Sequence, residues 1–364
     1  MTRTYSDLAE RQALEVDTSL VKTYLVEAHR GDEDPAALAR RSFADLAAGV
    51  GARVHDSDEP ALVTVEAKIR DEIVFAYVDF TNPRFWLIHS MASSNAIDWL
   101  MNRALLSPEL DRAWLPANLL EFASSLGSFR GLGLDYDRRV LHDIDLEQPD
   151  APVGFLKMQL WGNKASDVLR VLREPHAFPS ETTLAKVKVK FWLDGANQEV
   201  FTLDDIKYDG KITARGTDFA SHIGLTTTVY GVYERLVVAI EDEFGLEAVS
   251  EGGFLSLHGE PINVFFSRPV SNLKSFCEGL CSAAPPFRIW GVPTAVGNAF
   301  YRIHAVDLHV GCQVMLEVTK DFARVFLPAG SCGNTVLRLV TNLQHHYDAL
   351  VQAQSGAGEN VLGI

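Results

Sequence analysis

A recurring order of expected secondary structure constrains the fold of this chain more than any other feature of its sequence. The first occurrence opens with an apolar stretch at residues 23–31 that predicts a strand. Residues 34–51 then favour a helix, because Pro35 lies in the first turn and a glycine closes the segment. Three short apolar stretches that predict strands follow, and a second helix begins near Ser94. The order is β-α-β-β-β-α.

The same order returns twice farther along the chain, which predicts an α+β fold. It is expected to contain three βαβββα-like pseudo-repeats, with mostly antiparallel sheets covered by helices and a helical insertion between the first two repeats. An Asp-Phe dipeptide recurs at a similar place in each repeat. The dipeptides are Asp79-Phe80, Asp218-Phe219 and Asp321-Phe322. The expected divisions are 20–106 (first repeat), 107–150 (insertion), 151–250 (second repeat, with a basic strand face), 251–352 (third repeat) and 353–364 (flexible tail).

The insertion contains two short expected helices, with Pro116 near the start of the second, and then a strand with charged residues at its end. Asp135 and Asp137 alternate along that strand, so both side chains point to one face. Two carboxylates on one face can hold a divalent cation or share a proton. Arg138 and Arg139 stand beside them, and no third oxygen ligand follows from the spacing. Local ion pairs are therefore favoured, and no metal site is predicted.

A second charged pattern lies in the expected strand at 185–193, where Lys186, Lys188 and Lys190 alternate with apolar residues. A row of lysines on an open sheet face can bind phosphate groups or nucleic acid. Lys207, Lys211 and Arg215 could extend this basic strip from neighbouring strands. The carboxylates that could neutralise it across strands are Glu199, Asp204, Asp205 and Asp209. An internally paired face is the favoured interpretation, and an anion-binding face is the alternative.

The cysteines and histidines do not assemble a recognisable catalytic or metal-binding motif. Cys277 and Cys281 are four residues apart on an expected helix, but they share its apolar face, which is typical of core packing rather than a zinc site. Cys332 precedes an expected helix, whose histidines at 345 and 346 lie several turns farther along. Enzymatic activity is left uncertain and is not favoured, and no cofactor is expected.

Charge and hydropathy narrow the classes of function. The net charge of −15 repels polyanions at long range, and no run of about 18 apolar residues is present. We therefore expect a cytoplasmic protein that contacts no membrane. The preferred hypothesis is a non-catalytic binding or regulatory protein that holds a partner protein or small ligand in grooves or at strand edges. The alternative is a nucleic-acid-associated protein, such as a bacterial defence or processing component. Strand edges also favour a homo-oligomer.

Overall fold

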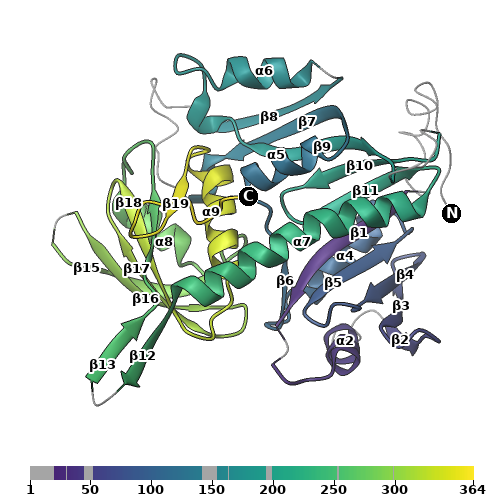
Figure 1. Ribbon diagram of the computed structural model, residues 1–364, viewed down its shortest axis with the longest axis horizontal. Coiled ribbons are helices and arrows are strands. Elements are labelled where there is room, and N and C mark those ends of the chain that lie inside the picture. Colours follow the sequence, from purple (N-terminus) through teal and green to yellow (C-terminus); the bar gives the residue numbers. More distant parts are fainter. Residues whose placement is uncertain are drawn as a thin grey trace. The chain divides into compact units, whose positions relative to one another are not determined.

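The computed structural model shows an α+β chain with mainly antiparallel sheets, as the sequence predicts (Figure 1). The described residues form two compact units. Unit 1 takes its residues from 20–113, 123–129 and 188–231, and unit 2 takes them from 114–122, 130–187 and 232–364. The structure describes residues 20–29, 31–44, 52–141, 154–162, 164–193, 199–251, 254–297 and 299–364.

The two units divide the second expected repeat between them. The boundary falls within the strand β9 (Leu184–Phe191) and the long helix α7 (Phe219–Phe244). The threefold repeat stays a prediction. The helix expected at 34–51 is α2 (Pro35–Ala44) as far as the described residues go, and residues 142–150 of the expected insertion lie outside them.

Unit 1 is built on an antiparallel sheet in which β1 pairs with β5 and β11. The first of the two short helices expected in the insertion is wrong, because β6 (Leu110–Arg112) forms a strand there and pairs with β1. Sheet pairing supplies hydrogen bonds that outweigh the weak helical preference of so short a segment. The strand order is β2 (Arg53–Asp56), β3 (Leu62–Ile69), β4 (Glu72–Asp79), β5 (Phe85–Ser90), β1 (Val21–Ala28), β11 (Lys211–Gly216) and β10 (Thr202–Lys207).

Helices cover the sheet of unit 1. α2 and α4 (Ser94–Ala104) enclose a core with Val26 and Trp86 of the sheet. α4 begins where the sequence predicts, and the Ser93 side chain caps it. The N-terminal half of α7 lies on the sheet as well, where the Tyr230 hydroxyl donates a hydrogen bond to the Val26 carbonyl. By length and composition α7 could cross a membrane, but half of its most apolar stretch is buried in the protein.

Unit 2 contains a second sheet, in which β12 and β13 form a hairpin that extends beyond the end of β18 (Figure 1). β12 runs parallel to β18, and the other pairs in this sheet are antiparallel. The order is β13 (Phe254–His258), β12 (Gly245–Glu251), β18 (Phe322–Pro328), β17 (Gln313–Val318), β16 (Tyr301–Asp307) and β15 (Ile289–Ala295), with β14 (Ile262–Phe265) pairing with both β18 and β19 (Gln352–Gln354).

A buried ion pair anchors helix α9 (Asn334–His346) to this sheet. The Arg338 guanidinium donates to the Asp307 carboxylate of β16 and to the Phe287 carbonyl, the latter at 2.7 Å, and the Thr335 hydroxyl donates to the same carboxylate. Because this group of residues is buried, one face of the sheet is closed. The other elements of unit 2 include α8 (Leu273–Leu280), α6 (Ala165–Leu172), the antiparallel pair β7 (Ser128–Asp137) and β8 (Phe155–Trp161), and the 3₁₀ turns Arg138–Leu141 and Pro179–Glu181; α5 (Ala117–Ser125) begins in unit 2.

The C-terminal residues, where the sequence predicts a flexible tail, are packed in unit 2. β19 pairs with β14, and Ala353 and Leu362 are buried. The Asn118 side chain donates a hydrogen bond to the Leu362 carbonyl. This segment therefore contributes to the unit's core.

Candidate functional site

The centre of the predicted basic strip is a buried ion-pair cluster in unit 1. Lys188 is 6% exposed, and its Nζ lies 3.5 Å from the Asp205 Oδ1 atom. An Arg215 nitrogen, Nη2, lies 3.6 Å from the other oxygen of the same carboxylate. Asp205 is one of the carboxylates expected to neutralise the strip, and it lies between two cations of the strip, Lys188 and Arg215.

Lys211 is also buried and paired. Its Nζ donates to both oxygens of Asp98 at 2.8 Å, and the Tyr24 hydroxyl donates to the same carboxylate. Burial alone would raise the pKa of Asp98, but the hydrogen bonds from Lys211 and Tyr24 outweigh it and hold the pKa below its usual value. This carboxylate was missed in the sequence, because it lies 113 residues from Lys211.

The remaining cations of the strip are partly exposed. Lys207 is half-buried, Lys190 Nζ lies 3.9 Å from the centre of the Phe201 ring, and Lys186 Nζ lies 5.2 Å from the centre of the Trp161 ring in unit 2. Burial and carboxylate pairing of Lys188, Lys211 and Arg215 leave no continuous row of exposed cations in this set of six residues.

Asp135 and Asp137 make local ion pairs in unit 2. An oxygen of Asp135 lies 3.1 Å from Lys157 Nζ. The Arg139 guanidinium donates two hydrogen bonds to Asp137, at 2.8 and 2.7 Å, and they lower the pKa of that carboxyl. Basic side chains thus occupy the positions that a cation would need.

The paired cysteines are core residues, as the helical pattern predicts. Cys277 and Cys281 are 0% and 4% exposed at α8, and burial raises the pKa of each thiol to about 12. A thiol with so high a pKa is a poor nucleophile and a poor metal ligand at neutral pH.

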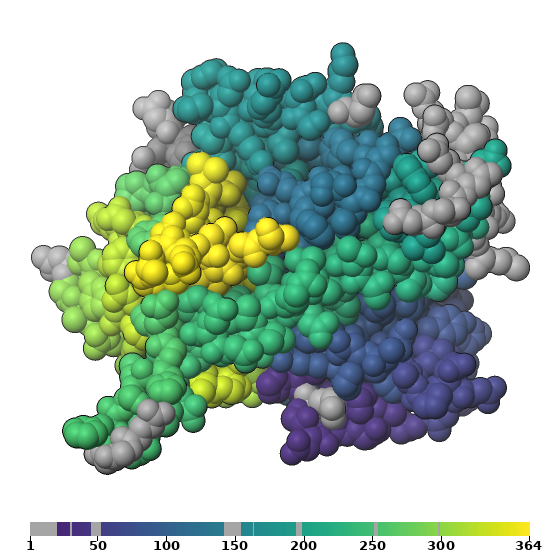
Figure 2. Space-filling view, in the orientation of Figure 1, coloured from purple at the N-terminus to yellow at the C-terminus, as the bar shows by residue number. Residues whose placement is uncertain are grey.

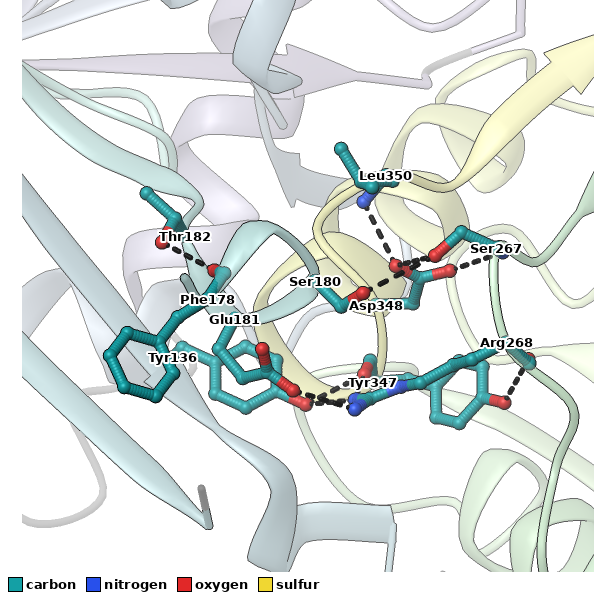
Figure 3. Close-up of polar contacts among 10 residues, drawn as sticks. All are labelled: Tyr136, Phe178, Ser180, Glu181, Thr182, Ser267, Arg268, Tyr347, Asp348 and Leu350. Carbon is teal, nitrogen blue, oxygen red and sulfur yellow. Dashed lines mark hydrogen bonds and ion pairs between the residues drawn. The ribbon is translucent and has the colours of Figure 1, made fainter. Parts of the chain in front are cut away.

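A polar cluster in unit 2 connects three loops. Arg268 donates to the Glu181 carboxylate at 2.7 Å, to the Tyr136 hydroxyl and to the Tyr347 carbonyl (Figure 3). Nearby, Asp348 accepts hydrogen bonds from the backbone and side chain of Ser267 at 2.6 and 2.9 Å. Burial raises the pKa of Tyr136 to about 12, so the hydroxyl stays protonated. The partners are other side chains and backbone groups, which is the pattern of a structural brace.

A chain of four polar side chains runs through the sheet of unit 1. Asp204 Oδ2 lies 2.8 Å from His222 Nδ1, and His222 Nε2 lies 2.7 Å from the Thr23 hydroxyl. The same hydroxyl lies 2.8 Å from His89 Nδ1. Asp204, His222 and Thr23 are at most 1% exposed, whereas His89 is partly exposed beside Phe219. We call these four residues the histidine chain.

The histidine chain has a defined direction when both rings are neutral. A carboxylate only accepts, so His222 Nδ1 donates to Asp204, and Thr23 donates to His222 Nε2. The Thr23 oxygen then accepts from His89 Nδ1. Burial and the neighbouring His222 lower the pKa of His89 to about 4, which keeps its ring neutral at pH 7. Every buried polar atom of the histidine chain therefore has a hydrogen-bond partner. Thr23, however, is too deeply buried to contact a substrate.

The second sheet has an open face on the side away from its core. One cross-strand row on this face is Val292, His304, Met315 and Phe326, from four neighbouring strands. A second row is Trp290, Val306 and Gln313. The side chains of Trp290 and Val292, at the edge of the sheet, are 56% and 67% exposed. A hollow of about 450 Å³ lies over this face. Its lining is Leu246, His304, Ala305, Val306, Gln313, Val314, Met315, Phe326 and Pro328.

The β12–β13 hairpin, which we call the arm, stands clear of the surface around its base (Figure 2). Phe254, Leu255 and Leu257 are 81%, 79% and 69% exposed. Leu246 pairs with Pro328, so its side chain lies on the open face. Alternation from Leu246 and pairing with β13 place Leu255 and Leu257 on that side too. The arm therefore continues the apolar part of the open face, whereas Arg302, Glu317 and Arg324 form a charged row at the end of the face away from the arm.

Sequence reasoning missed both the histidine chain and this apolar surface. The members of the histidine chain lie up to 199 residues apart, so no spacing reveals them. The Phe-Leu-Ser-Leu run at 254–257 carried a weak signal, because such a run resembles any half-buried strand until its neighbours are known.

Comparison with known proteins gives one family. A model of the MJECL33-like proteins matches residues 1–361. The uncharacterized protein MJECL33 of Methanocaldococcus jannaschii is 31% identical over 384 residues, an alignment that covers 96% of this chain and 90% of the relative.

Proposed function

The chain belongs to the MJECL33-like family, and we propose that it is a non-catalytic binding protein that holds a partner protein on the open face of unit 2. The observation that carries this proposal is the arm, whose Leu255 and Leu257 lie on the side of the open face and are 79% and 69% exposed. Exposed apolar clusters of this kind mark interaction sites, because burying each such side chain contributes about 1.5–3 kcal/mol.

The open face offers two modes of contact. The hollow of about 450 Å³ is lined mainly by apolar groups, so it can take up apolar side chains of a partner. β13 lies at the edge of the sheet, where its outer backbone groups can pair with an added strand. Both modes favour a protein partner over a small polar ligand.

The buried polar chemistry supports a binding role rather than catalysis. The spacing of Asp204, His222 and Thr23 is that of an acid–base triad, but the hydroxyl is 0% exposed and also hydrogen bonds to His89. A nucleophile in that place has no room for a reacting carbonyl.

The nucleic-acid alternative has less support. Lys188, Lys211 and Arg215 are buried and paired with carboxylates, so a phosphate would have to displace Asp98 or Asp205. If the alternative held, binding to an oligonucleotide would weaken steeply with salt and would be lost in Lys190→Ala or Lys207→Ala. We also propose a cytoplasmic location. The long apolar helix α7 is compatible with it, because half of its most apolar stretch is buried in the protein.

A comparative pull-down tests the binding role. Wild-type protein is compared with Leu255→Asp/Leu257→Asp, which places charges on the arm, and with Leu106→Asp, which changes an equally exposed leucine of unit 1 (66%). We expect a partner, including further copies of this chain, to be retained by wild type and Leu106→Asp and lost with the arm variant. Identical protein profiles for all three would overturn the proposal.

A further inference from the structure

The open face of unit 2 contains both a projection and a hollow. The arm carries Leu255 and Leu257 outward, and the hollow begins at the base of the arm on the same face, where Leu246, Met315 and Phe326 line it. A two-fold contact between identical chains needs a surface that is complementary to itself, with each projection matched by a cavity of the same surface. The open face meets this condition.

We infer that the partner on the open face is a second copy of the chain, with the arm of each copy seated in the hollow of the other. This inference rests on the proposed function and names the partner for the same surface. It predicts an isologous dimer in which the contact occurs twice.

The dimensions of the arm suit this arrangement. Ser250, which pairs with Leu255, lies four residues beyond Leu246 at the base of the arm, so the arm extends about 14 Å along the strand direction. A two-fold axis across the strands, midway between arm and hollow, brings each arm over the other copy's hollow. A volume of about 450 Å³ accommodates apolar side chains of the arm.

The distribution of charge also suits two copies of one acidic chain. With a net charge of −15, two copies repel each other at long range. On the side of the arm that continues the open face, the residues are Leu246, Ala248, Ser250, Leu255 and Leu257, and all are uncharged. Glu247 and His258 pair with each other on the opposite side. Two arms can therefore approach without placing like charges in contact.

A mixing experiment tests the inference. Leu257→Asp puts a charge on the arm, and Met315→Lys puts the opposite charge in the hollow. Size-exclusion chromatography with light scattering should give twice the 40.2 kDa chain mass for wild type and for Leu106→Asp. Each variant alone should run at the mass of one chain, because both of its contacts are damaged.

An equal mixture of the two variants should recover the dimer mass. In a mixed pair one arm and one hollow are unchanged, and the other contact joins an aspartate to a lysine. His304→Lys is a second hollow variant at an exposed position, and it covers the case in which Met315→Lys disturbs folding. Near-ultraviolet circular dichroism and the melting temperature of each variant check that it is folded.

The outcomes separate this inference from the proposed function. Recovery of the dimer on mixing establishes that arm and hollow meet in two copies. A wild type that has the mass of one chain, or variants that stay dimeric, overturns the second copy as partner. If wild type is monomeric and captures a different protein, and the arm variant does not capture it, the proposed function holds and only this inference fails.

Discussion

The histidine chain of unit 1 and the arm of unit 2 place polar and apolar side chains in opposite ways. In unit 1, the carboxylate, imidazole and hydroxyl of Asp204, His222 and Thr23 are at most 1% exposed. Each neighbouring pair in the histidine chain is joined by a hydrogen bond of 2.7–2.8 Å. In unit 2, the arm leaves Phe254, Leu255 and Leu257 mostly in solvent. The polar groups of the histidine chain are hydrogen bonded to one another within unit 1, whereas the apolar side chains of the arm are exposed, and we propose that a partner covers them. Under the proposed function, the histidine chain serves stability and the arm serves binding.

The largest expected effect comes from breaking the histidine chain. In His222→Leu, Asp204 and Thr23 lose their buried partner, which should lower the free energy of unfolding by about 3–5 kcal/mol. Denaturant unfolding measures the loss. The control His55→Leu changes an exposed histidine of the same unit and should stay within about 0.5 kcal/mol of wild type. An equal loss of unfolding free energy in both variants would contradict a structural role for the histidine chain.

Acid should weaken the protein through His89. The unfolded imidazole takes up a proton near pH 6.5, whereas burial lowers the folded pKa to about 4. Between these values the unfolded state binds more protons, so stability is fully present above pH 6.5 and falls as the pH drops toward 4. With allowance for the partial exposure of His89, the loss is about 2 kcal/mol. His89→Gln should flatten this part of the profile. An unchanged slope in His89→Gln would show that other groups cause it.

The arm should show the reverse behaviour. Leu255→Asp/Leu257→Asp should change the free energy of unfolding by no more than about 0.5 kcal/mol, because these side chains are already in water. Unfolding is measured at dilutions at which no association occurs. Association should nevertheless be lost in the same variant. A loss of several kcal/mol in the dilute chain would mean that the arm packs within its own unit, and the contrast between the units would disappear.

Salt should have the smallest effect. An apolar contact between two chains of net charge −15 should become tighter by roughly twofold when salt screens their repulsion. Sedimentation equilibrium at low and high salt measures the change. A steep weakening with salt would point instead to ion pairs in the contact, or to the basic strip and nucleic acid.

The order of the expected elements predicted the α+β class, and local pattern predicted two details, the helix with Cys277 and Cys281 in the core and the start of α4 near Ser94. Each of these depends on a few adjacent residues. The β6 strand could not be predicted, because its three residues are held by pairing with β1 rather than by their own preference. The partner of Lys211 and the histidine chain depend on residues far apart in sequence, and exposure of the arm depends on what the fold leaves uncovered.

In-cell photocrosslinking can show whether the arm contacts a partner. A photoreactive amino acid replaces Leu257 in the arm or, as the control, Leu106 in unit 1, in cells that naturally make the protein. We expect an abundant adduct from position 257, at twice the chain mass if the partner is a second copy, and little adduct from position 106. No adduct from position 257 above the level at position 106 would contradict the claim that the arm is where this protein binds its partner.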